Sequence, residues 1–254
     1  MFSLEFVIIC AALLVVAILY SSVGHGGASG YLAVLSLSGF AAMDVAWLKQ
    51  YAWCLNLVVA AIAFWHYYRA GHHIPKLTIP FIAASVPFAI LGGSLRVDGV
   101  LYDSLLSLTL VWAAWRLYSI SDEETEECTA PDLKIALPVG GSIGLMSGIV
   151  GVGGGIFLSP IILMKNWATP KATAATAALF IWVNSAASIA GASLSGQLEL
   201  EYATLLPFAG VVLIGGFVGS RYGAEIAPQQ MIRKLLVGVL IIAALRRLLG
   251  IVGI

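Results

Sequence analysis

The residues with the clearest chemical potential are two glycine clusters that interrupt otherwise apolar sequence. They read Gly24-His25-Gly26-Gly27 and Gly151-Val152-Gly153-Gly154-Gly155. Glycine permits a sharp bend and lets a ligand approach the backbone closely. A helix that starts at such a bend offers free N–H groups and the positive end of its dipole, which together attract anions. The clusters therefore predict an anion site, with close helix packing as the alternative use of the same glycines.

Polar side chains within two later apolar segments could complete this site. Lys49 and Asn56 are seven residues apart, so they share one face of a helix. Thr176 and Asn184 take the corresponding places in the second segment. An ionisable residue inside a membrane segment indicates a function by default, although Lys49 follows Asp44 closely enough to extend its amine to the membrane surface. An asparagine at this depth serves either as a ligand or as a link between helices.

Two further residues near the first cluster could support other chemistry. His25 titrates near neutral pH and could couple a proton to the movement of an anion, or it could remain neutral on a backbone carbonyl. Gly27-Ala28-Ser29-Gly30 also matches the Gly-x-Ser-Gly signature of rhomboid intramembrane proteases. Their serine needs a histidine on a later helix as its base, and the sequence contains no histidine after His73. We therefore expect no enzyme activity.

The composition indicates that these residues belong to a membrane protein. Hydrophobic residues make up 60% of the 254 residues and charged residues only 10%, against about 25% charged in soluble domains. The formal net charge is zero, which gives no reason to expect a nucleic-acid partner. The three cysteines are far apart and show no metal-binding spacing, so we expect neither a metal nor a cofactor. The expected location is the cell membrane, crossed several times and in contact with the lipid bilayer.

Charges and turn residues divide the chain into ten apolar segments, which predict an all-α polytopic fold. The predicted segments are 4–20, 28–40, 44–68, 77–95, 99–118, 134–149, 155–165, 171–195, 202–221 and 230–250. An acidic run separates the fifth segment from the sixth. We therefore expect a first transmembrane repeat at 1–120, an acidic linker at 121–133 and a second transmembrane repeat at 134–254.

The two repeats resemble each other at a nearly constant offset. Adding 127 to the numbers of the first three glycines leads to glycines of the second cluster, and Asn56 and Asn184 differ by 128. Each repeat also carries a Gly-Gly pair in its fourth segment. Because five segments is an odd number, the second repeat would lie inverted relative to the first, as in many transporters.

The second and seventh segments are too short to cross about 30 Å of hydrocarbon as helices. We therefore predict that 4–40 and 134–165 form hairpins or broken helices with their glycine bends at membrane depth, and that the two pairs enter the membrane from opposite faces. Lys and Arg are more frequent in the loops on the side opposite the N-terminus. That bias predicts that this opposite side is cytoplasmic.

Several motifs, most of them in the second repeat, together resemble those of a known family. The second glycine cluster followed by Pro160, the run Thr-Pro-Lys-Ala-Thr-Ala-Ala-Thr at 169–176, Asn184 and the Gly-Gly pair of the ninth segment resemble the TauE/SafE family of sulfite and organic-anion exporters. The resemblance implies a membrane permease that exports sulfite, sulfonates or related small anions without catalytic chemistry. The first repeat departs from the family pattern, because His25 interrupts the glycines and Lys49 stands where a small or hydroxyl residue is expected.

The residues and the resemblance together predict a secondary transporter that exports a small anion, such as sulfite or another sulfur oxyanion. It would work by alternating access between the repeats, with protons as the candidate coupling ion. An anion channel is the alternative. A transporter for a cation or metal would need carboxylates or cysteines at membrane depth, and Asp and Glu occur only near the segment ends.

Overall fold

The computed structural model describes residues 4–97, 128–228, 230–231, 234–235 and 238, and all regular structure in these ranges is helical. We call 4–97 the first half and 128–238 the second half. The predicted segment 99–118 and most of 230–250 lie outside the described residues, as does most of the acidic linker. The expected all-α, polytopic fold class is confirmed over the described part of the chain.

The first half contains four described α-helices and one short turn. They are α1 (Leu4–Ser21), α2 (Ala28–Ser36), the 3₁₀ turn Gly39–Ala42, α3 (Val45–Arg69) and α4 (Pro75–Ser94). The second half contains counterparts of the four α-helices in the same order, and a π-helical turn after the last of them. They are α6 (Leu133–Val150), α7 (Gly155–Met164), α8 (Pro170–Leu194), α9 (Tyr202–Arg221) and the π-helical turn Tyr222–Ile226.

Matched helices in the two halves have nearly equal lengths. α1 and α6 have 18 residues each, α3 and α8 have 25 each, and α4 and α9 have 20 each. α2 has 9 residues and α7 has 10. The order of long and short helices in the first half is therefore repeated in the second half, in line with the offset between the glycine clusters.

Side-chain caps explain where the two longest helices begin. The Asp44 carboxylate accepts a hydrogen bond from the Trp47 N–H at 2.7 Å, at the start of α3. At the start of α8, the Thr169 hydroxyl accepts one from the Ala172 N–H at 3.4 Å, and Pro170 follows as the first helical residue. Both arrangements satisfy backbone donors that have no partner inside the helix.

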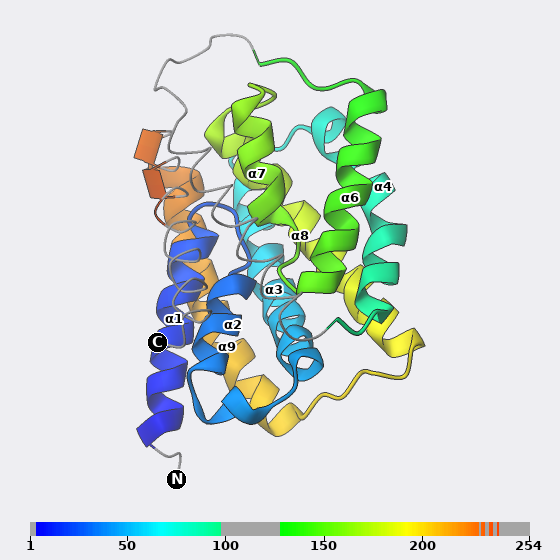
Figure 1. Ribbon diagram of the computed structural model, residues 1–254. Helices are drawn as coiled ribbons and strands as arrows, with labels where there is room; N and C mark the ends of the chain where they lie inside the picture. Colours follow the sequence, from blue (N-terminus) through cyan, green and yellow to red (C-terminus); the bar gives the residue numbers. More distant parts are fainter. Residues whose placement is uncertain (1–3, 98–127, 229, 232–233, 236–237, 239–254) are drawn as a thin grey trace.

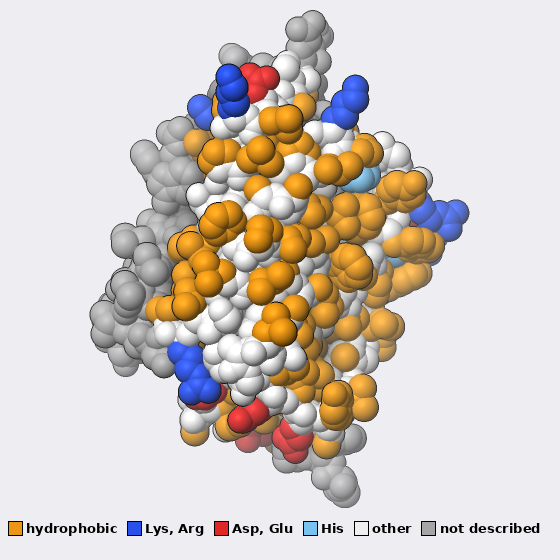
Figure 2. Space-filling view, turned by 90° about the vertical axis from the view of Figure 1, so that its right-hand side faces the viewer, with side chains coloured by type: hydrophobic (Ala, Val, Ile, Leu, Met, Phe, Trp, Pro, Cys, Tyr) orange, Lys and Arg blue, Asp and Glu red, His pale blue; other side chains and the backbone are white. Residues whose placement is uncertain are grey.

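Six described helices are long and apolar enough to cross a membrane, namely α1, α3, α4, α6, α8 and α9 with the turn that follows it. Figure 2 shows an apolar surface across the middle of the molecule, with charged side chains gathered towards its two ends. α2 and α7 are roughly 14 and 15 Å long at 1.5 Å per residue, about half the hydrocarbon thickness. The chain is therefore a multi-pass membrane protein with two half-length helices.

The long helices surround a central pair. α3 packs against α8, while α9 packs against α1 and α3, and α4 packs against α6 and α8. Exchanging the two halves converts the contacts of α9 into those of α4. In Figure 1, α1 begins at the lower end of the molecule and α6 at the upper end, and α2 and α7 each turn back towards the end from which their hairpin started.

Glycines allow the closest of these helix contacts. A β-carbon on Gly215 would lie 2.7 Å from the Leu14 carbonyl oxygen of α1, and one on Gly219 would overlap the backbone at Ile18. Between α4 and α6, a β-carbon on Gly148 would lie 2.5 Å from the Gly93 nitrogen. Side chains at these positions would force the helices apart, so each half is joined tightly to the other half by its first and fourth helices.

Candidate functional site

Both predicted bends have the backbone conformation that favours glycine. In the first bend, Gly24 and Gly27 have φ of +74° and +100°. At the matching positions of the second bend, Gly151 and Gly154 have φ of +86° and +83°. Most side chains are strained in this region. Gly27 and Gly154 are also the residues directly before the first turns of α2 and α7.

The two bends converge on the middle of the central helix pair. A β-carbon on Gly153 would lie 2.7 Å from the Asn56 Nδ2 and 2.8 Å from the Ile181 side chain, and one on Gly26 would press on the same two side chains. Asn56 is the twelfth of the 25 residues of α3, and Ile181 is the twelfth of the 25 residues of α8. The bends therefore lie halfway along the two longest spans.

Asn56 is bound into the first bend. Its Oδ1 accepts a hydrogen bond from the Ala28 N–H at 3.0 Å, and its Nδ2 donates to the Ser185 hydroxyl at 3.3 Å. The side chain is fully buried. Asn56 thus satisfies a backbone donor at the start of α2, in the way a capping side chain does, and links it to α8.

The second bend has different hydrogen-bond partners. Among the described residues, no side chain hydrogen-bonds the first N–H groups of α7, which follow Gly154. Asn184, the counterpart of Asn56, donates from its Nδ2 to the Phe180 carbonyl at 2.8 Å. Its buried Oδ1 has no hydrogen-bond partner among the described residues, and neither does the hydroxyl of Ser147 beside the Gly154 bend. Unused hydrogen-bonding groups are therefore present beside the second bend, at Ser147, and on the central helix α8, at Asn184.

Lys49 lies beside the second bend. Its side chain runs along Gly151, where an added β-carbon would lie 2.6 Å from the Lys49 Cγ. The amine donates to the Ile149 carbonyl at 3.2 Å, at the end of α6, where the helix dipole favours a cation. Although only 3% exposed, Lys49 lines a cavity of about 250 Å³ together with Asp44 and Arg96.

His25 joins the first bend to the second half. Its Nδ1 lies 3.0 Å from the Val23 carbonyl oxygen, and its Nε2 lies 3.4 Å from the Ser159 hydroxyl of α7. Ser29, the serine of the rhomboid-like match, instead pairs with the Tyr20 hydroxyl at 2.9 Å. The histidine therefore contacts a carbonyl, as one of its two predicted uses requires, and also bridges the halves.

The structure brings most of the predicted site residues to the bends. Gly26 and Gly153 face Asn56, Gly151 faces Lys49, and Gly24 presses on the backbone of α8 at Ala174. Gly155 instead packs against Ile181.

Thr176 lies apart from this group. Its hydroxyl pairs with the Thr78 hydroxyl of α4 at 2.9 Å, and within the described ranges no hydrogen bond joins it to either bend. Sequence reasoning missed three partners of the bends, Ile181, Ser185 and Ser159. Ile181 and Ser185 are spaced one helical turn apart, so their position on the face of α8 that includes Asn184 was a usable signal.

The described residues contain no group of three or more His, Cys, Asp or Glu side chains that could hold a metal ion.

The two ends of the molecule are joined across the halves by different side chains. At the end where α3 begins, Gln50 donates to the Gln197 carbonyl at 2.6 Å, and Arg96 donates to the Gln197 side chain at 3.1 Å. At the other end, His72 Nε2 and the Lys171 amine lie 3.3 and 3.1 Å from the Ala224 carbonyl oxygen. Burial lowers the pKa of His72 below its ordinary value, the carbonyl opposes this shift, and the Lys171 charge adds to it.

Comparisons with known proteins agree with a transport role. Residues 9–247 match the family described as "Sulfite exporter TauE/SafE". A "Probable membrane transporter protein y4hK" from Sinorhizobium fredii (strain NBRC 101917 / NGR234) is 34% identical over 241 residues, which cover 93% of this chain and 96% of that protein. No solved structure matches the chain.

Proposed function

Because the chain belongs to the sulfite exporter TauE/SafE family of membrane transporters, we propose that it exports a small sulfur oxyanion such as sulfite by alternating access. The observation that carries this proposal is the convergence of both glycine bends on Asn56 and Ile181, halfway along the central spans. Transporters hold their substrate near the bilayer midplane, between repeats, where broken helices direct their N-termini at anionic groups.

The second bend is the proposed binding place for the anion. Among the described residues no side chain caps the start of α7, so the N–H groups of Gly155 and Ile156 and the helix dipole are available to a negative ligand. Lys49 lies next to the same bend and adds a full positive charge. In a buried, low-dielectric site this charge and the helix dipole attract an anion more strongly than they would in water.

The cavity beside Lys49 provides a route to this place. Arg96 lines it at the end of α4, where the side chain attracts anions from solution, and Lys49 lies deeper within the same cavity. Asp44 also lines it, but its carboxylate accepts the Trp47 N–H at the start of α3. The cavity therefore holds two basic side chains against one carboxylate, and this excess of positive charge favours the entry of an anion.

Alternating access would require the two halves to be inverted repeats. The equal lengths of matched helices, the exchanged contacts of α4 and α9, and the opposite ends from which α1 and α6 start all support this arrangement. Networks of different composition join the halves at the two ends, so each end could open in turn while the bends stay together.

His25 is the candidate group for proton coupling. A protonated imidazole would donate from Nδ1 to the Val23 carbonyl and from Nε2 to the Ser159 hydroxyl, so both ring nitrogens already have an acceptor nearby. Taking up or releasing that proton would change the link between the first bend and α7, which is the helix proposed to hold the anion.

Counterflow of labelled sulfite into sulfite-loaded proteoliposomes tests the proposal. Lys49→Gln removes the charge at the second bend and should lower the flux by about 10-fold or more, because a charge-assisted hydrogen bond contributes about 1.5–3 kcal/mol. Lys165→Gln, at an exposed lysine just after α7, is the matched control and should keep wild-type flux. Equal flux in both variants would overturn the assigned site, and sulfite currents without counterflow would favour a channel.

A further inference from the structure

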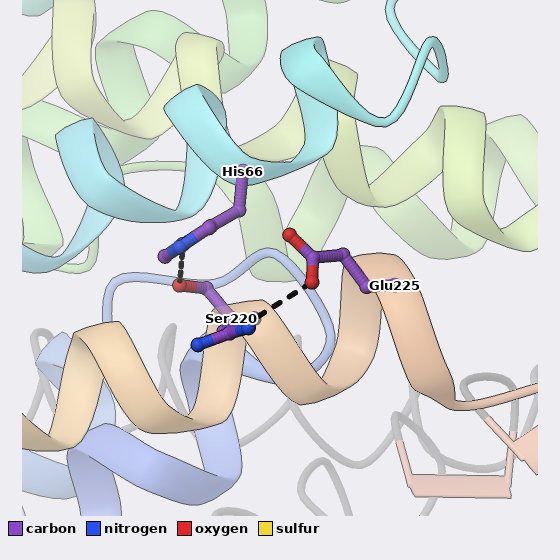
Figure 3. Close-up of polar contacts among 4 residues, drawn as sticks. His66, Ser220 and Glu225 are labelled. Atoms are coloured by element: carbon purple, nitrogen blue, oxygen red, sulfur yellow. Dashed lines mark hydrogen bonds and ion pairs between the residues drawn. The ribbon is translucent and has the colours of Figure 1, made fainter.

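A second cavity, of about 390 Å³, lies at the opposite end of α3 from Lys49. One wall is the last turn of α3 and the other is the end of α9 with the π-helical turn (Figure 3). The lining residues are Trp65, His66, Arg69, Ala70, Phe217, Arg221 and Glu225. None of them belongs to the glycine bends, so the proposed transport site does not account for this cavity.

The cavity carries an excess of positive charge. Arg69 and Arg221 face a single carboxylate, Glu225, whose Oε2 lies 3.3 Å from the Arg221 Nε. Both members of this ion pair are about half exposed, at 61% and 46%, so the pair is weak and open to competition. Guanidinium groups donate two parallel hydrogen bonds to phosphate oxygens. The chemistry therefore suits a phosphate or a similar oxyanion.

The floor of the cavity is held rigid by His66. The Ser220 hydroxyl donates its only proton to the Gly216 carbonyl at 2.5 Å, so it must accept the hydrogen bond from the His66 Nδ1 at 2.8 Å. Figure 3 shows this contact between α3 and α9. Phe217 stacks edge-on against the same imidazole, with ring centroids 4.9 Å apart. The two arginines therefore extend from helix ends that are fixed relative to each other.

An exposed apolar stripe leads away from this cavity along α9. Leu206, Leu213, Ile214 and Phe217 are 45–65% exposed and lie at helical spacing on the side that ends in Arg221. Trp65 of α3, at 47% exposed, stands beside the cavity with Arg69 over its ring at 5.2 Å. Because α9 is a membrane span, this stripe faces hydrocarbon. A cationic cavity at the end of a lipid-facing stripe fits an amphiphile with an anionic head.

We propose that this cavity binds the phosphate headgroup of an anionic phospholipid, with Arg69 and Arg221 on the phosphate and the acyl chains along the α9 stripe. The loop bias of Lys and Arg puts this end of the molecule on the cytoplasmic side, where anionic lipids attract basic groups near the membrane surface. A small soluble anion would use the arginines and leave the apolar stripe without a role.

Quenching of Trp65 fluorescence tests this proposal. The purified protein is placed in vesicles of phosphatidylcholine that contain brominated phosphatidylglycerol or brominated phosphatidylcholine, and the Trp65 signal is the difference from Trp65→Phe. We expect about 30-fold tighter association of the brominated phosphatidylglycerol, and loss of this preference in Arg69→Gln/Arg221→Gln, since each of the two basic groups contributes about 1 kcal/mol at such a surface. Lys134→Gln/Lys165→Gln, at exposed lysines of the same end, is the control and should keep the preference.

Three results would overturn the proposal. They are equal quenching by the two lipids, an unchanged preference in the double arginine variant, and displacement of phosphatidylglycerol by inorganic phosphate or sulfite, which would assign the cavity to a soluble anion. Size-exclusion chromatography checks that the variants are folded. If the double variant fails this check, Arg69→Gln and Arg221→Gln are measured singly, and each should reduce the preference by about threefold or more.

Discussion

The two glycine bends share a backbone conformation but differ in the side chains that hydrogen-bond to their backbone groups. In the first bend, Asn56 binds the Ala28 N–H, and His25 reaches across to Ser159 of α7. In the second half, the matching Asn184 turns its Nδ2 to the Phe180 carbonyl of its own helix, and no side chain of the described residues caps the start of α7. Both bends therefore contact the other half, but only the first has its helix start bound by a side chain in the described structure. We expect the second bend to bind the ligand.

The two copies of a duplicated motif can therefore keep the same backbone conformation and still take different roles. Lys49 of the first half lies at the second bend, whereas Thr176, its counterpart by the offset of 127, pairs with Thr78 of α4. Lys49 thus places a positive charge at the second bend, and in the described structure no lysine takes the corresponding place at the first. Four experiments test this difference between the two bends.

The largest effect is expected when a bend itself is altered. Gly153→Ala should destabilise the protein by about 2–5 kcal/mol, because a side chain at positive φ costs about 1–2 kcal/mol and the added β-carbon would also press on Asn56 and Ile181. Gly196→Ala is the matched control, since Gly196 has a φ of +68° with open space around it. Unfolding in detergent, followed by tryptophan fluorescence, should show the larger loss for Gly153→Ala. Equal losses would mean that the close contact at the bend is unimportant.

The second experiment separates the two asparagines. Asn56→Ala leaves the buried Ala28 N–H without its partner and should lower the free energy of unfolding by about 1–3 kcal/mol. Asn184→Ala removes a side chain whose Oδ1 has no partner in the described structure, so its stability loss should be smaller and its loss of sulfite flux larger. Detergent unfolding and counterflow are measured on both variants. The reverse ranking would show that the first bend holds the ligand.

A smaller effect is expected at the bridge between the bends. Ser159→Ala removes the hydroxyl that lies 3.4 Å from the His25 Nε2. The expected loss of unfolding free energy is about 0.5–1.5 kcal/mol, the usual net contribution of one hydrogen bond. Ser94→Ala, at an exposed hydroxyl that donates to the Leu91 carbonyl of its own helix at 2.7 Å, serves as the control in the same unfolding assay. A loss no greater than that of the control would show that the contact between Ser159 and His25 does not stabilise the first bend.

The smallest effect is expected when the pH is changed, at the loops that join α3 to α4 and α8 to α9. Because the pKa of folded His72 is lowered from 6.5, its contribution to stability is present above pH 6.5 and is lost as the pH falls through the lowered value. Hydrogen exchange at 70–74 should therefore accelerate on acidification, after correction for the intrinsic rate. The matching loop at 195–199 is held by Gln50 and Gln197, which do not titrate. His72→Gln should remove the acceleration, and its persistence in that variant would assign it to another group.

Much of the fold could be predicted because it follows from local sequence patterns. Glycines at a repeated offset indicated both bends, and the shortness of the following apolar segments indicated half-length helices. The predicted segment 28–40 is α-helical only to Ser36, because Ser38 starts a 3₁₀ turn by accepting the Phe40 N–H. Capping by a neighbouring hydroxyl depends on rotamers that apolar periodicity does not record.

The candidate site was less predictable, because its contacts join residues far apart in sequence. The seven-residue spacing of Lys49 and Asn56 predicted one shared face of α3, and both side chains are buried. The spacing carried no information that Asn56 lies between the two bends and Lys49 beside the second. Asn56 and Asn184 look equivalent in sequence, and only the packing of α2 and α7 against the central helices distinguishes their hydrogen bonds. The binding roles of these residues stay predictions that the flux measurements test.

The tight glycine contacts between α1 and α9 also have a consequence for biosynthesis. About 180 residues separate the end of α1 from the start of α9, so at 5–20 residues per second the ribosome needs roughly 10–40 s to make the partner of the first helix. α1 is the most apolar of the six spans, which allows it to wait in lipid without that partner. A nascent chain stalled before Tyr202 would hold α1 in the bilayer with its α9-facing surface still open to quality-control proteases.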